Sequence, residues 1–150
     1  MIKLLQSNYD EASGHSYVKI GTECGIFEGH AFLHPDDKDV ASSFFGCEIA
    51  EYRATIEYFK KKLHFLNIRQ LSLLDLKRDY KNLKANSFLY SIGLGDRYCD
   101  ILDKRIYQNE IQINEYKANI KSLKAVINNA FTAREKTLAK IQQNKEKDSE

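Results

Sequence analysis

The stretch FGCEIAEYRATIEYFKKKLHFL, residues 45–66, carries apolar side chains at alternating steps of four and three residues. This spacing repeats about every 3.5 residues and places them along one stripe of an α-helix, as in a coiled coil. The stripe consists of Phe45, Ile49, Tyr52, Ile56, Phe59, Leu63 and Leu66. A narrow apolar stripe has to be buried against a partner helix, which is either another part of this chain or a second copy of it.

A second stripe with the same rhythm runs through the last third of the chain. It consists of Cys99, Leu102, Ile106, Asn109, Ile113, Tyr116, Ile120, Leu123, Ile127 and Ala130. Asn109 is the polar exception, and such a residue usually fixes helix register or oligomeric state at some cost in stability. The two stripes together predict a long antiparallel helical hairpin, with helical regions over residues 36–84 and 96–141 joined by a loop over 85–95.

The first stripe changes beyond Leu66. If the rhythm continued, Gln70 and Lys77 would be buried, whereas a shifted stripe would bury apolar residues only. The shifted stripe consists of Leu73, Leu76, Tyr80 and Leu83. We therefore expect a kink or short break near Asn67. Asp96 is expected to be the N-cap of the last helix.

The sequence predicts a small antiparallel β-meander over residues 1–34. Strand-like runs cover 2–8, 15–22 and 26–34, separated by turn-forming clusters at 10–14 and 23–25. In the third run the small Gly29 and Ala31 share a face with Phe27, which would let a helix pack closely there. Pro35 ends that run, and the acidic residues 36–39 favour a helix start.

The predicted fold class is therefore α+β, with an N-terminal β-meander followed by a coiled-coil-like helical hairpin that assembles as a multimer. One domain is expected to span residues 1–141, and the tail 142–150 is expected to fray because it contains no apolar residue. Its 150 residues are enough for one domain with its own core.

The net charge of +2 is too small for a protein dedicated to binding a nucleic-acid duplex. No apolar run approaches the roughly 20 residues of a membrane-spanning helix, and the N-terminus lacks the features of a secretory signal. Three cysteines without a Cys-x-x-Cys pair fit reduced thiols. We expect a cytoplasmic protein with no membrane partner.

Catalytic and metal-binding patterns are weak throughout the chain. The four histidines show none of the spacings of zinc sites, and no cysteine lies in a signature of a thiol enzyme. Glu48 and Glu51 are three residues apart on a helix, which is typical of a solvated face. We expect no enzymatic activity, no cofactor and no metal site.

The loop before the last helix is the candidate ligand site. Its glycines can approach a ligand closely, and the N–H groups at a helix start attract anions. The rings of Phe88 and Tyr90 could stack on a base, and the amide of Asn86 could donate to and accept from the edge of a base. The guanidinium group of Arg97 could donate two parallel hydrogen bonds to a phosphate. The alternative is a simple hinge that reverses the chain.

A family resemblance rests on residues 25–39, GIFEGHAFLHPDDKD, and residues 41–54, ASSFFGCEIAEYRA. This segment resembles the first-described family of Thoeris anti-defence proteins, which are phage-encoded signal sponges. The resemblance implies an N-terminal sheet, long helices, a homo-dimer or homo-hexamer, and sequestration of cyclic ADP-ribose-type immune signals, or cyclic oligonucleotides, in the cytoplasm of an infected bacterium. It also implies that Arg53, Phe88 and Tyr90 contact the ligand.

From the residues alone, Arg53 would pair with Glu57 on its own helix. The functional alternative to a sponge is a protein-binding inhibitor or coiled-coil adaptor, such as an anti-CRISPR protein or a phage assembly factor. That alternative would use helix faces rather than the loop.

Overall fold

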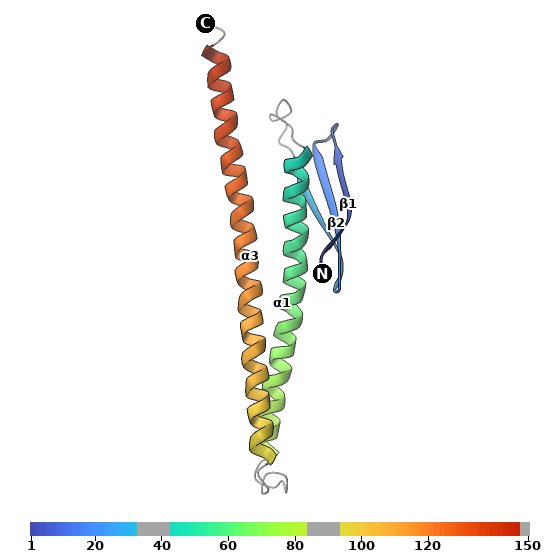
Figure 1. Cartoon of the computed structure of the whole chain (residues 1–150), viewed down its shortest axis with the longest axis vertical. Helices are drawn as coiled ribbons and strands as arrows, with labels where there is room; N and C mark the ends of the chain where they lie inside the picture. Colours follow the sequence, from blue (N-terminus) through green and yellow to red (C-terminus); the bar gives the residue numbers. More distant parts are fainter. Residues whose placement is uncertain (33–42, 84–93, 148–150) are drawn as a thin grey trace. The chain divides into compact units, whose positions relative to one another are not determined.

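The computed structural model describes residues 1–32, 43–83 and 94–147, which form a three-stranded sheet and two long helices (Figure 1). The elements are β1 (Lys3–Asp10), β2 (His15–Thr22), β3 (Gly25–Phe32), α1 (Ser43–Leu83) and α3 (Leu94–Lys147). The predicted α+β class is confirmed. The helix start expected near residue 36 lies outside the described residues, as do residues 85–93 of the loop predicted over 85–95, whose last two residues belong to α3.

The chain divides into two compact units, and each long helix contributes a segment to both. Unit 1 comprises Met1–Phe59 and Asn119–Glu150, and unit 2 comprises Lys60–Ala118. Unit 1 therefore contains the sheet and one segment of each helix. Unit 2 consists of helical segments alone within the described residues.

The sheet is the expected antiparallel meander, with strand order β1-β2-β3. β2 has the predicted bounds, and a register irregularity in β1 lies between Leu4 and Gln6. The β1–β2 turn is closed by the Asp10 carboxylate, which accepts hydrogen bonds from the Ala12 N–H at 3.0 Å and from the Ser13 hydroxyl at 2.5 Å. Gly14 ends this turn with a φ of 66°, a conformation that glycine adopts without strain.

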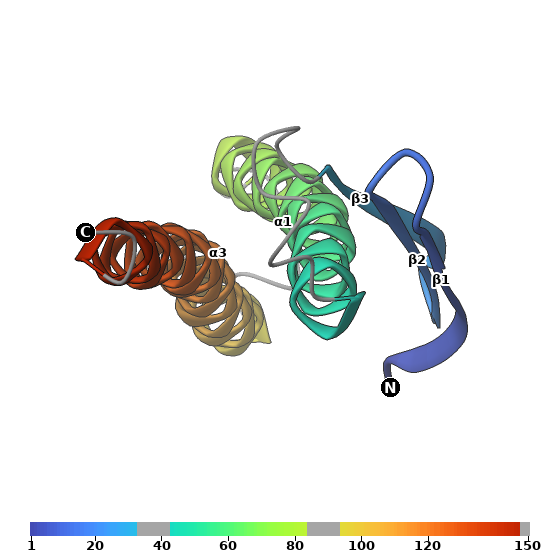
Figure 2. The same cartoon turned by 90° about the horizontal axis from the view of Figure 1, so that it is seen from above.

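In unit 1 the sheet packs on one side of α1, and the α3 segment covers the other side (Figure 2). The sheet side is very tight, because a Cβ atom at Gly29 would overlap the backbone of Ala50 and Ala54 on α1. Ala31 is also buried there. The expectation that small residues in the third strand permit close helix packing is confirmed.

The opposite side of α1 in unit 1 carries the first apolar stripe. Ile49 and Ile56 are buried with Ile127 of α3, and the rings of Phe45 and Phe131 meet edge-on with centroids 5.7 Å apart. The two stripes therefore pair with each other within the chain, which decides between the two partners that the sequence left open.

Unit 2 continues this pairing with more polar contacts. Asn109 is buried, and its Nδ2 donates to the carbonyl oxygen of Leu66 at 2.9 Å and to Oε1 of Gln70 at 2.8 Å. Lys77 forms an ion pair with Asp103. Gln70 and Asn109, one polar residue from each stripe, thus bond to each other, while Lys77 pairs with Asp103, which follows the stripe residue Leu102. The Oδ1 atom of Asn109 is buried without a hydrogen-bond partner among the described residues.

These contacts overturn the expected break near Asn67. α1 is one unbroken helix from Ser43 to Leu83, and the four-three rhythm continues through Gln70 and Lys77. The Lys77 side chain is only 25% exposed, whereas Leu76 is 44% exposed. The prediction was wrong because it treated polar side chains as unable to occupy the stripe, although a partner on α3 satisfies each of them.

The ends of α3 also differ from expectation. The helix is assigned from Leu94, so Asp96 lies in its first turn rather than at the N-cap. A carboxylate there still faces the positive end of the helix dipole. At the other end the helix extends to Lys147, six residues past the predicted end at residue 141.

Candidate functional site

The structure describes only two of the five residues predicted to contact a ligand. Asn86, Phe88 and Tyr90 lie outside the described residues. Arg97 is exposed near the start of α3 and belongs to unit 2, and Arg53 is half-buried on α1 in unit 1. The predicted site as a whole is therefore still a prediction.

Arg53 contacts the sheet. Its Nη1 donates a hydrogen bond of 2.6 Å to the carbonyl oxygen of His30 on β3. β3 is an edge strand, and an edge strand presents backbone groups that need partners other than a neighbouring strand. Arg53 thereby joins α1 to the sheet edge, a contact across 23 residues that the spacing along the helix could not predict.

The side of the sheet that faces away from α1 gathers aromatic and polar side chains, and we call it the outer sheet face. Strand register arranges it in three rows of three residues. The rows are Asp10, His15 and Phe32; Asn8, Tyr17 and His30; and Gln6, Lys19 and Glu28. Side chains alternate along a strand, so these nine share a face while Ser16, Val18 and Ile20 are buried against α1.

Four of the nine form a continuous aromatic cluster. The ring of His15 stacks on Phe32 with centroids 4.5 Å apart and on His30 at 5.2 Å, and Tyr17 lies 5.0 Å from His30. The Nε2 atom of His15 and Nδ1 of His30 are 2.9 Å apart, which is hydrogen-bonding distance, and the ring tautomers decide which nitrogen donates. Phe32 is 71% exposed, and its ring is therefore available to a planar ligand.

Polar side chains border the cluster on its β1 side, where the surface is hollowed into an open depression of about 770 Å³. It is lined by Gln6, Ser7, Asn8, Tyr9, Asp10, His15 and Tyr17. The two amides can each donate and accept hydrogen bonds. The hydroxyl of Ser13, with the backbone N–H of Ala12, lowers the pKa of Asp10, which is therefore anionic at neutral pH and can only accept.

The charges in the third row largely compensate one another. Lys19 Nζ lies 3.1 Å from Oε1 of Glu28. The pKa of Glu28 is lowered by a hydrogen bond with Tyr17 and by Lys19, and the pKa of Lys19 is raised by hydrogen bonds with Tyr17 and Glu28. With Asp10 also present, the face suits a planar group with hydrogen-bonding edges better than a row of phosphates.

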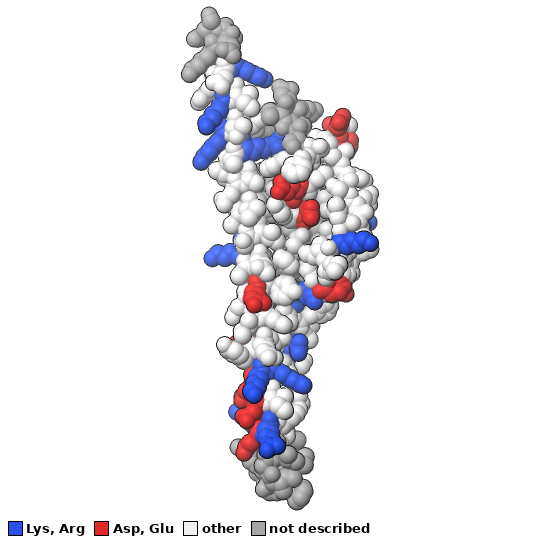
Figure 3. Space-filling view, in the orientation of Figure 1, with Lys and Arg blue, Asp and Glu red and all other residues white. Residues whose placement is uncertain are grey.

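Charge elsewhere follows the same mixed pattern. Figure 3 shows, among the described residues on the face that it displays, both signs of charge with broad uncharged areas between them. Within the described ranges, no three His, Cys, Asp or Glu side chains are grouped so that they could hold a metal ion. The helices in those ranges also lack an apolar stretch long enough to cross a membrane.

Sequence reasoning missed the outer sheet face. The available signal was the alternation along the third strand, which places Glu28, His30 and Phe32 on the face opposite Gly29 and Ala31. The pairing of His30 with Tyr17 and of Phe32 with His15 depends on strand register, which turn length alone left open.

Comparison with known proteins adds no relative: no family model, curated protein or solved structure matches this chain.

Proposed function

We propose that this protein binds a cyclic nucleotide immune signal and sequesters it without cleaving it, in the cytoplasm of a phage-infected bacterium. The ligand would be a cyclic ADP-ribose isomer or a cyclic oligonucleotide. The observation that carries the proposal is the solvent-facing aromatic cluster of Tyr17, His30, His15 and Phe32. The resemblance of residues 25–54 to the Thoeris anti-defence sponges supports the same ligand class.

In this proposal a base stacks on the exposed ring of Phe32 or on Tyr17, since stacking of a base on an aromatic side chain contributes about 1–3 kcal/mol. Gln6 and Asn8 line the adjoining depression and would read the edge of the base or hold a ribose hydroxyl. The Asp10 carboxylate would accept from an amino group or a hydroxyl, and would repel phosphate.

The loop residues predicted from the sequence provide the other candidate contacts. Phe88 and Tyr90 would stack a base, Asn86 would contact its edge and Arg97 a phosphate. Arg53 belongs to the same unit as the aromatic cluster and lies next to it through the His30 backbone, so it would supply a cation on the sheet side. Sheet and loop are distinguishable by mutation because no residue belongs to both.

Thermal unfolding with added nucleotide tests the proposal. A cyclic ADP-ribose isomer, a cyclic dinucleotide and a cyclic trinucleotide are each added in excess, and a captured ligand should raise Tm because it binds only the folded state. Heating the complex should release the ligand with unchanged mass. Conversion of the ligand would contradict sequestration.

The variants Tyr17→Ala and Phe32→Ala should weaken binding about tenfold or more if the base stacks on the sheet. Ile26→Ala is the matched control, because Ile26 is also exposed on β3 but lies outside the cluster. If only Phe88→Ala and Arg97→Ala weaken binding, the site is in the loop. If no nucleotide changes Tm, the proposal fails.

A second candidate function is protein binding through a helix face, by an inhibitor or adaptor. It is supported by Tyr107 and Ile111, which are exposed one helical turn apart on α3 in unit 2. Residues four apart lie on one face of a helix, so they offer a small apolar surface to another helix. Capture of a phage or host protein that is abolished by Ile111→Asp but unaffected by Phe32→Ala would favour this function.

A further inference from the structure

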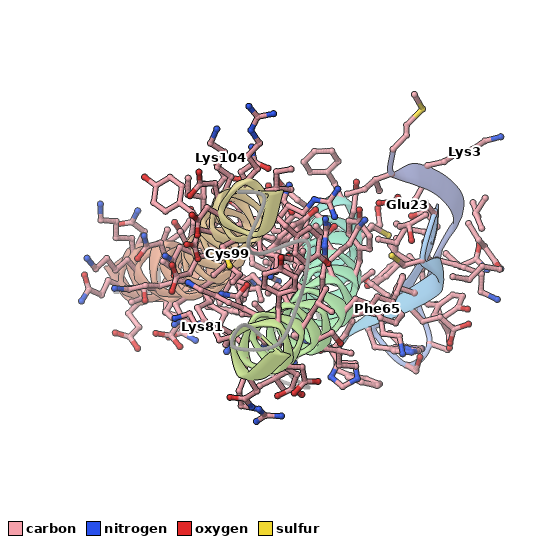
Figure 4. All side chains as sticks on the ribbon, turned by 90° about the horizontal axis from the view of Figure 1, so that it is seen from below. Lys3, Glu23, Phe65, Lys81, Cys99 and Lys104 are labelled. Carbon is pink, nitrogen blue, oxygen red and sulfur yellow. The ribbon has the colours of Figure 1, made fainter. Side chains whose placement is uncertain are left out.

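A second apolar surface lies on α1 in unit 2, on the side of the helix away from its pairing with α3. Phe65, Ile68 and Leu71 are 47%, 48% and 64% exposed, although each is a large apolar side chain. Figure 4 looks along the helices and shows Phe65 and Cys99 on opposite sides of α1. We call these three residues the α1 outer patch.

The patch is separate from the stripe that pairs the two helices. The stripe residues of α1 in this unit are Leu63, Leu66, Gln70, Leu73, Lys77 and Tyr80, and all are half-buried. Leu66 and Gln70 bond to Asn109, and the Tyr80 ring lies 4.8 Å from Tyr98. The α1 outer patch therefore has to be covered by something other than α3 of the same unit, or remain in water.

Charges of opposite sign flank the patch symmetrically. Lys61 lies four residues before Phe65, and Asp75 lies four residues after Leu71, so the five positions follow steps of four, three, three and four around Ile68. All five are exposed and lie on one face of the helix. The pattern reads the same in both directions, except that the charge at one end is positive and at the other negative.

We propose that the α1 outer patch is a homodimer interface whose twofold axis passes through Ile68. A twofold axis perpendicular to the helix brings each position into contact with the one equally far on the other side of the axis. Ile68 then packs on the partner's Ile68, Phe65 on the partner's Leu71, and Lys61 pairs with the partner's Asp75. Each unlike contact occurs twice.

The charge arrangement favours a second copy of this chain over an unrelated helix. If the two α1 helices pack antiparallel, each Lys61 lies opposite an Asp75 of the other copy. If they packed parallel, Lys61 would lie opposite Lys61 and Asp75 opposite Asp75, which is unfavourable. Lys61 Nζ lies 5.0 Å from the centroid of the Phe65 ring, so its ammonium is held at the edge of the patch. At the other end Asp75 accepts from Arg78 at 3.1 Å, an exposed pair that leaves the carboxylate open to a further partner.

The interface is small, with three apolar side chains from each chain. Stable interfaces bury about 800 Å² per partner, and such a patch lies at the weak end of that scale. The dimer should accordingly have a Kd in the micromolar range. This Kd should rise measurably with salt concentration, because both ion pairs are exposed to solvent. The inference is independent of the ligand, since none of these residues belongs to the outer sheet face or the loop.

Disulfide trapping in the full chain tests the register. Ile68→Cys should form a covalent dimer under mild oxidation, because only a position on the axis meets itself. Phe65→Cys and Leu71→Cys should not crosslink alone but should form a mixed disulfide when combined. Peptide mapping identifies the linked cysteines, and the wild-type protein with Cys24, Cys47 and Cys99 is the control.

Sedimentation equilibrium gives an independent measurement. Ile68→Asp should raise the dimer Kd about a hundredfold or more, since two like charges would meet on the axis. Ile111→Asp on α3 should leave the Kd unchanged. The proposal would be overturned if the wild-type protein stayed monomeric over a roughly hundredfold range of concentration around the micromolar. It would also be overturned if Ile68→Cys formed no disulfide between two chains, or if both aspartate variants lost dimerisation equally.

Discussion

The same helix is used differently in the two units. In unit 1, α1 is buried on two sides, with Ala50 and Ala54 against the sheet and Ile49 and Ile56 on the side of α3. In unit 2 the α1 segment pairs on one side only, through contacts that include Asn109 and the Lys77–Asp103 ion pair, and its other side exposes Phe65, Ile68 and Leu71. A four-three rhythm therefore predicts that a stripe is buried, but not how much stability that burial contributes.

Unit 1 should dominate the free energy of unfolding, because apolar burial stabilises in proportion to area whereas polar contacts contribute little net. Unit 2 instead fixes the register of the hairpin, since only one alignment pairs Asn109 with Gln70 and Lys77 with Asp103.

The largest effect is expected at the contact between sheet and helix. Gly29→Val should destabilise the protein by about 3–5 kcal/mol, because the new side chain would overlap backbone atoms of α1 that cannot move independently. Gly21→Ala is the matched control: its Cβ would lie 3.1 Å from the flexible end of Leu5, which can shift. Chemical denaturation followed by circular dichroism measures both. Equal stability of the two variants would show that the close packing is not energetically important.

The next largest effect compares two isoleucines on α1. Ile56→Asp in unit 1 should cost several kcal/mol, because an unpaired charge would enter a site that is only 6% exposed. Ile68→Asp in unit 2 should change the stability of the folded chain by less than about 1 kcal/mol, since that side chain is exposed. Thermal unfolding at low protein concentration separates the two. If both variants were equally destabilised, the α1 outer patch would have to be buried within the chain.

A smaller effect is expected within the stripe of unit 2. Asn109→Ala should cost about 1–3 kcal/mol, because it leaves the half-buried Gln70 and the Leu66 carbonyl without their donor. Replacing Asn109 and Gln70 together by Leu should recover this loss or exceed it, since an apolar pair of similar volume needs no partner. A double mutant that is less stable than Asn109→Ala would mean that the polar pair contributes to stability directly.

The smallest effect concerns pH and the β1–β2 turn. The pKa of Asp10 is lowered in the folded state, mainly by the Ser13 hydroxyl and then by the Ala12 N–H. Its contribution to stability is therefore fully present above the ordinary carboxyl value of 3.8 and is lost as the pH falls through the folded pKa. In Asp10→Asn the difference in Tm from wild type should shrink between pH 6 and roughly pH 3. A constant difference would rule out the charge of Asp10 as its cause.

The candidate site was predictable only in part. The sequence indicated that aromatic residues next to polar ones could bind a nucleotide, but it directed attention to the loop with Phe88 and Tyr90. The outer sheet face combines Tyr17 from one strand with His30 and Phe32 from the next, and no local pattern shows that these rings meet. The spacing along the helix suggested Glu57 as the partner of Arg53, whereas the structure shows Arg53 donating to the backbone carbonyl of His30 on β3.

The sequence by itself determined the type of each described element, the order of the meander and the two stripes that pair as a hairpin. These depend on periods of 2 and 3.6 residues and on turn residues, which are local properties of the chain. Only the tertiary structure decided that Gln70 and Lys77 stay in the stripe, because their partners Asn109 and Asp103 lie 39 and 26 residues away. A polar side chain can be buried when another satisfies it, and which one does so depends on how the two helices align.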